Sequence, residues 1–193
     1  MSSPAQAVIT VNSNSIQPIA VVSRMIHGST TPPFEVNLPL TGTRGVECRS
    51  GGANRNYQMV FKFANPLTSV GGASVTGGTG SVSSSGIGLN TQEYIVNLTG
   101  VTNAQYLTVT LTNVHDSVGN SGTVVGPQMG VLIGDTNANG AVNSSDIAQT
   151  QSQSGQPVTS SNFREDVTVN GAINSSDIVT VQASSGTGLP SSP

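Results

Sequence analysis

Two stretches near the C-terminus determine how this sequence is interpreted: DTNANGAVNSSD at residues 135–146 and DVTVNGAINSSD at residues 166–177. Both lie in a longer repeat, NGAVNSSDIAQTQSQSG (Asn139–Gly155) and NGAINSSDIVTVQASSG (Asn170–Gly186), which is identical at 11 of 17 positions. Oxygen-bearing side chains stand at positions 1, 3, 5, 9 and 12 of each stretch, and glycine stands at position 6. The repeat therefore predicts two copies of one small structural unit with the same chemistry.

This spacing is that of EF-hand calcium loops, in which the chain wraps around a cation that takes six to eight oxygen ligands. In the first loop the predicted ligands are Asp135, Asn137, Asn139 and Asp146 through their side chains, Ala141 through its carbonyl, and Asn143 directly or through water. In the second loop the equivalents are Asp166, Thr168, Asn170, Ala172, Asn174 and Asp177. We expect two calcium ions, with weaker binding in the second loop because Thr168 replaces a carboxamide. Two carboxylates per loop predict the affinity of extracellular modules.

The few charges are divided unevenly along the chain. Only 8% of residues are charged, against roughly 25% in an average soluble domain. Residues 1–134 carry five basic and four acidic side chains, whereas residues 135–193 carry one basic and five acidic side chains. This asymmetry indicates a second module at the C-terminus, with negative charge that two divalent cations would neutralise.

Composition excludes several classes of function. Six scattered basic residues cannot form the dense cationic face that a nucleic-acid partner requires. The longest apolar stretch, near Ile19–Ile26, is interrupted by Ser23 and Arg24 and falls far short of the ~20 residues of a membrane span. With 4% aromatic residues and no tryptophan, a stacking platform for sugars or bases is not expected. The neutral Ser, Thr, Asn and Gly surface is typical of an extracellular protein.

Alternating apolar residues over the first 130 positions predict β-strands. The apolar sets are Phe34, Val36, Leu38 and Leu40; Tyr57, Met59, Phe61 and Phe63; Tyr94, Val96 and Leu98; and Leu107, Val109 and Leu111. Separated by Gly, Asn, Pro and Ser, they predict seven to nine strands in two packed sheets. Within Gly71–Gly88, we expect a narrow hairpin around a Gly-Gly-Thr-Gly turn.

The N-terminal arm, residues 1–14, has two interpretations. Ala7–Val11 would form a strand, and the polar spacer NSNSIQP follows it. The strand is either the first one of the sheet or a strand donated to the sheet edge of a neighbouring subunit. The opening MSSPAQAVITV lacks the basic and long apolar regions of a signal peptide, so an exported form is expected to have lost its leader.

Other candidate residues favour structural roles. Cys48 has no internal disulfide partner and is expected to be a buried thiol, with an intermolecular bridge or a nucleophile as alternatives. His27 and His115 form no recognisable catalytic set. Glu35, Glu47 and Glu93 are glycosidase candidates, but their strand phase predicts that they point outward. We therefore predict that the chain is not an enzyme. Asn97 begins a glycosylation sequon, Asn97-Leu98-Thr99.

The C-terminal repeat resembles the type I dockerin, a duplicated calcium module of secreted bacterial proteins. It has Asp at position 12 of each loop, a single short helix after each loop (Ser144–Ser154 and Ser175–Ser184) closed by Gly155 and Gly186, and no helix before the first loop. The phrase YLTVTLTNVHDSVGN (Tyr106–Asn120) resembles the closing strands of bacterial immunoglobulin-like domains. The predicted organisation is an arm at 1–14, a mainly β immunoglobulin-like sandwich at 15–133 and a dockerin-like module at 134–190.

The dockerin resemblance implies docking to a cohesin domain in a cell-surface or polysaccharide-degrading complex. It also implies contact with the partner through loop positions 10 and 11, which here are Ser144, Ser145, Ser175 and Ser176. Basic residues often found later in such helices are replaced by Ser152, Gln153, Ala183 and Ser184. Because of this departure, the leading hypothesis is a non-enzymatic extracellular structural subunit that assembles with copies of itself, in the form of a filament stabilised by calcium. A dockerin that binds a cohesin-like partner is the alternative.

Overall fold

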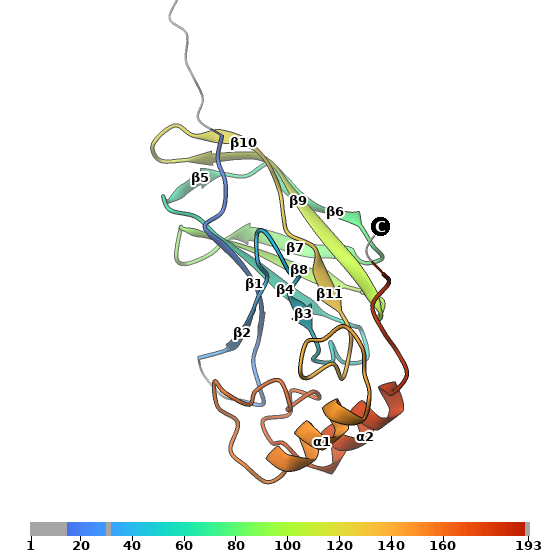
Figure 1. Ribbon diagram of the computed structural model, residues 1–193. Helices are drawn as coiled ribbons and strands as arrows, with labels where there is room; N and C mark the ends of the chain where they lie inside the picture. Colours follow the sequence, from blue (N-terminus) through green and yellow to red (C-terminus); the bar gives the residue numbers. More distant parts are fainter. Residues whose placement is uncertain (1–14, 30–31, 192–193) are drawn as a thin grey trace, which may run out of the picture.

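The computed structural model describes residues 15–29 and 32–191, which form a β region followed by two short helices (Figure 1). The strands of this described part are β1 (Ala20–Met25), β2 (Phe34–Asn37), β3 (Val46–Glu47), β4 (Tyr57–Lys62), β5 (Leu67–Ser69), β6 (Gly72–Gly77), β7 (Ser81–Ile87), β8 (Glu93–Thr99), β9 (Gln105–Asp116), β10 (Ser121–Val125) and β11 (Met129–Val131). The helices are α1 (Ser144–Gln153) and α2 (Ser175–Ser184). The N-terminal arm, with its predicted strand at 7–11, lies outside the described residues.

The strands form two sheets. One has the order β2-β1-β4-β8-β7, and the other has the order β10-β9-β11-β3, with β5 and β6 also paired to β9. All pairs are antiparallel except β3 with β11. The mainly β class and the two packed sheets are confirmed. The strands outnumber the predicted seven to nine, because β3, β5 and β11 are too short to show alternation.

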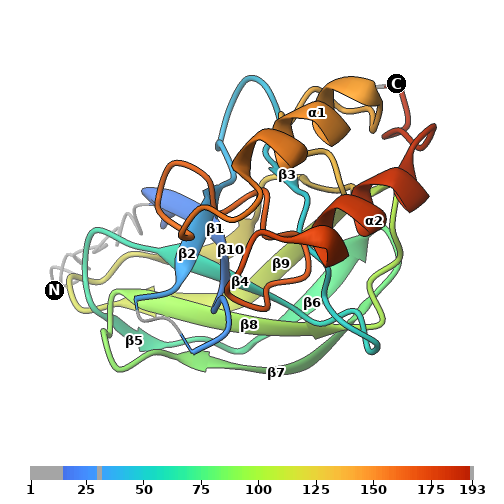
Figure 2. The ribbon, with the colours of Figure 1, turned by 90° about the horizontal axis from the view of Figure 1, so that it is seen from below.

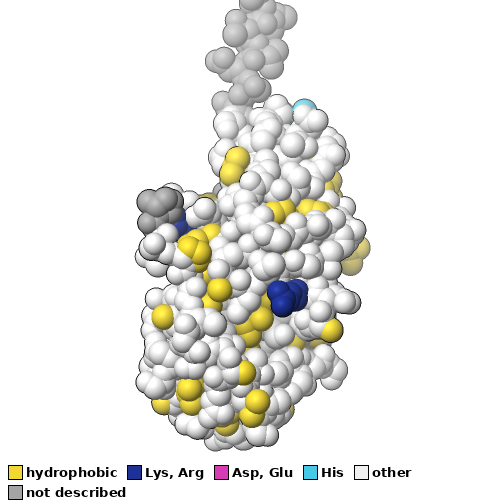
Figure 3. Space-filling view, turned by 90° about the vertical axis from the view of Figure 1, so that its right-hand side faces the viewer, with side chains coloured by type: hydrophobic (Ala, Val, Ile, Leu, Met, Phe, Trp, Pro, Cys, Tyr) yellow, Lys and Arg dark blue, Asp and Glu magenta, His cyan; other side chains and the backbone are white. Residues whose placement is uncertain are grey.

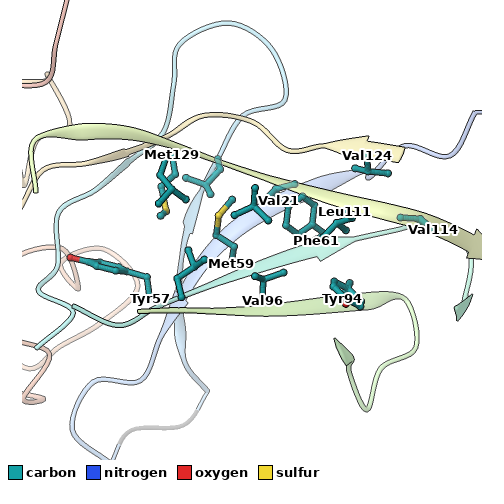
Figure 4. Close-up of a cluster of buried hydrophobic side chains, with 14 of the residues drawn as sticks. Val21, Tyr57, Met59, Phe61, Tyr94, Val96, Leu111, Val114, Val124 and Met129 are labelled. Atoms are coloured by element: carbon teal, nitrogen blue, oxygen red, sulfur yellow. The ribbon is translucent and has the colours of Figure 1, made fainter. Parts of the chain in front are cut away.

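Most of the predicted alternating residues lie between the sheets, together with residues outside those sets such as Val21 and Met129 (Figure 4). Leu40, predicted to alternate with them, is instead 45% exposed, because β2 ends at Asn37. On β4 and β8, Phe61 pairs with Tyr94 and Met59 with Val96, and all four side chains are buried. They meet residues of β9 such as Leu111, which is fully buried. Because every second residue of these strands faces the core, burial of these apolar side chains supplies most of the driving force for folding.

The predicted hairpin within Gly71–Gly88 is wrong. Although β6 and β7 are consecutive, β6 pairs with β9 in one sheet and β7 pairs with β8 in the other. The two strands thus belong to different sheets, and Val75 and Val82 pack against the core from opposite sides. The connection turns at Gly78, whose φ is +82° and where a Cβ would lie 2.5 Å from the Tyr106 carbonyl oxygen. The turn residues identified by sequence therefore link two sheets, not two strands of one sheet.

The helices cover one end of the β region, and α1 and α2 lie side by side across it (Figure 2). A second apolar cluster lies at this end and consists of Val46, Leu132, Val142, Val167 and Val181. It combines β3 with both loops and α2, so the module shares its core with the β region. Neither helix of the described chain is long and apolar enough to cross a membrane.

Candidate calcium-binding module and its contact with the β region

Each helix begins at the predicted residue, and its cap uses loop positions 9 and 12. At α1, the Asn143 side chain accepts a hydrogen bond from the Ser145 amide, and the Asp146 carboxylate accepts one from the Asn143 amide at 3.0 Å. The same reciprocal cap joins Asn174 and Asp177 at α2. This capping box fixes the last loop residues before any ligand is bound. Two predicted ligand positions in each loop are therefore held by the helix that follows.

In the first loop, backbone amides surround the carboxylate at position 1. The Gly140 amide donates to Asp135 Oδ2 at 2.8 Å, and the Asn139 amide donates to Oδ1 at 3.0 Å. Across the loop, Asp146 Oδ1 accepts from the Asn137 amide at 3.2 Å. The glycine φ of +87° at position 6 permits the bend that brings these amides around the carboxylate.

The second loop repeats this arrangement. Asp166 Oδ2 accepts from the Gly171 amide at 2.8 Å, and Oδ1 accepts from the Asn170 amide at 3.1 Å. Asp177 Oδ1 accepts from both the amide of Thr168, at 2.9 Å, and its hydroxyl, at 2.8 Å. The equivalent residue of the first loop, Asn137, donates to Asp146 Oδ1 through its backbone amide and not through its side chain. The structure thus brings the predicted ligands of each loop together in the same order.

The donors fit calcium. Asp135, Asp146, Asp166 and Asp177 are all fully buried, and no Lys or Arg of the described residues forms an ion pair with any of them. Of these four carboxylates, only Asp166 contacts a histidine of the described chain, His27. Burial raises the pKa of Asp135, although amide donors oppose this, and the charge of Asp146 raises it further. A divalent cation would compensate two such carboxylates at once. Among the described residues, no three His, Cys, Asp or Glu side chains lie close enough together to hold a metal ion by themselves, so amide, hydroxyl and carbonyl oxygens would complete each loop.

The predicted partner-contact serines are exposed in both helices. Two of them also serve the loops: the Ser145 hydroxyl donates to Asn143 Oδ1 and accepts from the Asn137 side chain, both at 2.8 Å. Ser176 contacts Asn174 and Asn170 in the same way. The residues at position 10, Ser144 and Ser175, form no side-chain hydrogen bond within the described chain. The position 10 hydroxyls therefore remain open to a partner.

Backbone hydrogen bonds attach the module to the β region. The Gly28 amide donates to the Val169 carbonyl at 2.8 Å, and the Ser50 amide donates to the Val167 carbonyl at 2.7 Å. Arg164 donates to three carbonyl oxygens, those of Asp135, Thr136 and Val46, at 2.7–2.9 Å. The guanidinium thus joins the start of the first loop to β3.

Sequence reasoning missed the polar residues beneath this contact. Glu47, predicted to point outward, is instead fully buried and paired with Arg49 at 2.6 Å, and Arg49 also donates to the Ser23 carbonyl of β1. His27 is also fully buried and lies 2.8 Å from Asp166, 139 residues away in the chain. The one sequence feature that points to this cluster is Glu47-Cys48-Arg49, in which two opposite charges stand two residues apart and can form an ion pair.

Four other candidate residues, Cys48, Asn97, Glu35 and Glu93, have defined surroundings. Cys48 is a free, fully buried thiol, as expected, and burial raises its pKa to about 12, which makes it a poor nucleophile. The Asn97 side chain is half-buried and donates to the Ser84 hydroxyl at 2.9 Å. Glu35 and Glu93, the other two glycosidase candidates, both bind Arg24 on the sheet surface.

Comparison with known proteins agrees with the position of this module. No curated protein and no solved structure matches the chain significantly. The family model of the dockerin type I domain matches residues 133–184, which span both loops and both helices. Dockerin type I domains typically bind calcium. This chain therefore carries a dockerin type I match at its C-terminal end, behind a β-rich region.

Proposed function

We propose that this chain is a calcium-dependent docking subunit of an extracellular complex, in which the module binds a cohesin-like partner. The observation that carries the proposal is the dockerin type I match over both loops and both helices. Two calcium ions, one in each loop, would fix the helices that present the contact residues. The proposed role is binding, without a catalytic step.

The arrangement of the module supports this role, since the β region contacts the loops and leaves the outer helix faces open. α1 exposes Ser144 and Ala148, and α2 exposes Ser175 and Val179 at the equivalent positions. Val179 is 61% exposed, so an apolar side chain is available on the surface of α2. Each helix thus offers a hydroxyl with a small or apolar side chain one turn later.

The surface around these helices predicts a partner contact with little charge. One face of the molecule shows scattered hydrophobic side chains and no charged ones at the end formed by the helices (Figure 3). The basic residues of many dockerins are replaced here by polar or small residues, of which Ser152 and Ala183 are exposed. Hydrogen bonds and apolar contacts would therefore dominate the interface.

The self-assembling filament subunit has less support than the docking module. Its proposed link, the donated strand at 7–11, lies outside the described residues, and the dockerin match favours docking to a different protein. Sedimentation in calcium and in chelator separates the two: a filament subunit would form long assemblies, whereas the docking subunit stays monomeric without its partner.

A binding assay tests the docking function. The full chain is passed over an immobilised panel of cohesin domains, first in calcium and then in chelator. We expect binding only in calcium, and a loss of about tenfold or more when Ser144→Asp and Ser175→Asp are combined with Val179→Asp, because charges would be buried against the partner. Both helices are changed because either could bind alone.

Ser69→Asp is the matched control, since Ser69 is exposed on β5, away from the module. It should bind like the native chain. Failure of every cohesin to bind the native, calcium-loaded chain would contradict the docking function, and binding that the triple change leaves intact would contradict the assignment of the helix faces.

A further inference from the structure

A line of buried polar side chains runs from the β region into the second calcium loop. Glu47 binds Arg49, Arg49 contacts His27, and His27 contacts Asp166, the residue at position 1 of that loop. All four residues have 0% exposure. Burying a polar group destabilises the fold unless the group is hydrogen-bonded. Four such residues in contact with one another are therefore expected to have a physical role.

Arg49 is fully satisfied, and this fixes its orientation. Its Nε donates to Glu47 Oε1, and Nη2 donates to Glu47 Oε2 and to the Ser23 carbonyl. The remaining Nη1 donates to the Phe34 carbonyl and to His27 Nε2, both at 3.1 Å. The five N–H groups of a guanidinium are thus all used, and none of them can accept a hydrogen bond.

This contact determines which nitrogen of His27 carries the hydrogen. Arg49 only donates, so His27 Nε2 must accept, and the ring hydrogen resides on Nδ1. His27 Nδ1 lies 2.8 Å from Asp166 Oδ2 and therefore donates to it. His27 is therefore held by Arg49 of the β region and in turn holds the Asp166 carboxylate of the module in a fixed orientation.

The two oxygens of Asp166 are engaged differently. Oδ2 accepts from both Gly171 and His27, each at 2.8 Å, whereas the one donor to Oδ1 among the described residues is the Asn170 backbone amide at 3.1 Å. Two short bonds to Oδ2 fix the plane of the carboxylate and leave Oδ1 as the oxygen with free lone-pair capacity. Oδ1 is therefore the atom that His27 holds ready for a cation.

The first loop has no such support from the β region. In the described chain, the Asp135 side chain accepts only from Asn139 and Gly140, both within its own loop. Arg164 reaches the Asp135 carbonyl, which is not a predicted ligand atom. The duplicated loops thus provide an internal comparison, because they share their ligand pattern and differ in the contact at position 1.

We propose that His27 is a positioning residue for the second calcium loop, which the β region completes, whereas the first loop is self-sufficient. This inference rests on the calcium binding of the proposed function and names a residue outside the dockerin match. The contact compensates for Thr168, which replaces a carboxamide in that loop. By linkage, calcium in the second loop tightens the contact between module and β region by the same factor as that contact tightens calcium binding.

A calcium titration of the full, ¹⁵N-labelled chain tests the proposal. The Gly140 and Gly171 amides donate to the position 1 aspartates, so their NMR signals report the two loops separately. His27→Gln retains an acceptor for Arg49 and removes the donor to Asp166, whereas His27→Asn retains a donor near Nδ1 and gives up the Arg49 contact. We expect His27→Gln to weaken the second loop about tenfold and to leave the first unchanged. His27→Asn should recover part of that loss.

Several outcomes would overturn the proposal. A purely structural histidine would give both variants the same lower stability and an unchanged ratio between the two calcium affinities. If neither variant folds, the ¹⁵N shifts of the native His27 ring decide, since a hydrogen on Nε2 contradicts the donation to Asp166. Calcium that shifts neither glycine amide in the native chain would overturn the calcium sites themselves, whereas two responsive loops insensitive to His27→Gln would overturn this inference alone.

Discussion

Phe163 of the module stacks on Phe34 of β2, with ring centroids 5.2 Å apart and planes 3° from parallel. The His27 ring meets both at its edge, at centroid distances of 5.1 and 6.1 Å, and the Arg49 guanidinium lies 5.3 Å from the centre of the Phe163 ring. The two stacked rings thus pack against His27 and Arg49, the central residues of the buried polar line. The module and the β region are therefore joined by a packed interface.

Replacing Phe163 tests how much this interface contributes to stability. Phe163→Ala removes the stack and the contacts with His27 and Arg49, so we expect a loss of about 2 kcal/mol in the free energy of unfolding, below the range for a fully buried phenylalanine because Phe163 is half-buried. Urea denaturation provides the measurement, and Val118→Ala, at a side chain 65% exposed, is the control. Equal midpoints for the two variants would show that the interface contributes nothing to stability.

Gly28 permits the close approach of the β region to the second loop. Its φ is +58°, and a Cβ there would lie 2.7 Å from the Asn170 carbonyl oxygen. Gly28→Ala should therefore push the segments apart, at a cost of about 1–3 kcal/mol, and speed hydrogen exchange at Gly28 and Ser50. Gly52→Ala is a matched control, because Gly52 has a φ of +67° but no atom within 4 Å of its Cβ position. The same loss in both variants would assign the effect to backbone strain alone.

The Glu47–Arg49 ion pair should make the free energy of unfolding depend on pH in the acidic range. Burial alone would raise the pKa of Glu47, but the charge and hydrogen bonds of Arg49 hold it below the ordinary value of 4.5. The stabilisation from ionised Glu47 is therefore fully present above pH 4.5 and is lost as pH falls through the lower, folded-state pKa. Glu47→Gln leaves the Arg49 charge buried and unpaired, and we expect a cost of about 3 kcal/mol at pH 7.

Urea midpoints of the native chain and Glu47→Gln, measured from pH 7 down to pH 3, check this sign. The difference between the two should shrink only below pH 4.5. Glu35→Gln serves as the comparison, since Glu35 binds Arg24 and Lys62 at the partly exposed sheet surface, where solvent weakens the pairs. A Glu47→Gln difference that stays constant down to pH 3 would contradict the ion-pair account.

Removal of a calcium ligand should affect the module more than the β region. Asp135→Ala deletes the carboxylate that the Gly140 and Asn139 amides surround, so the first loop loses both its cation and its bend. Binding energy at such loops contributes directly to folding energy. We expect the far-UV signal of α1 and α2 to fall, and Ser152→Ala, at an exposed helix position, to leave it unchanged. Helical signal that persists in Asp135→Ala would count against calcium-coupled folding.

The sequence predicts features that depend on local spacing. The strand alternation at Tyr57–Phe63 reports one face of one strand, and the burial of Tyr57, Met59 and Phe61 follows from it. The loops are equally local, because twelve consecutive residues supply ligands, glycine bend and helix cap. Helices at Ser144 and Ser175 could therefore be placed to within a residue.

Contacts between distant segments could not be predicted in this way. His27 and Asp166 are far apart in the chain, and neither has a neighbour whose pattern points to the other. Strand phase predicts that Glu47 points outward, but in the fold it is fully buried and Arg49 neutralises its charge there. The Gly71–Gly88 segment has turn residues suited to a hairpin, and only the competing partners β8 and β9 decide where its strands pair.

Hydrogen exchange of the full chain, measured by mass spectrometry in calcium and in chelator, tests the central claim most directly. If the module folds on calcium, protection over α1 and α2 will be lost in chelator, while peptides from β4 and β8 in the core keep theirs. Identical exchange of the helices in the two conditions would contradict the account and would leave the module a metal-independent part of the β protein.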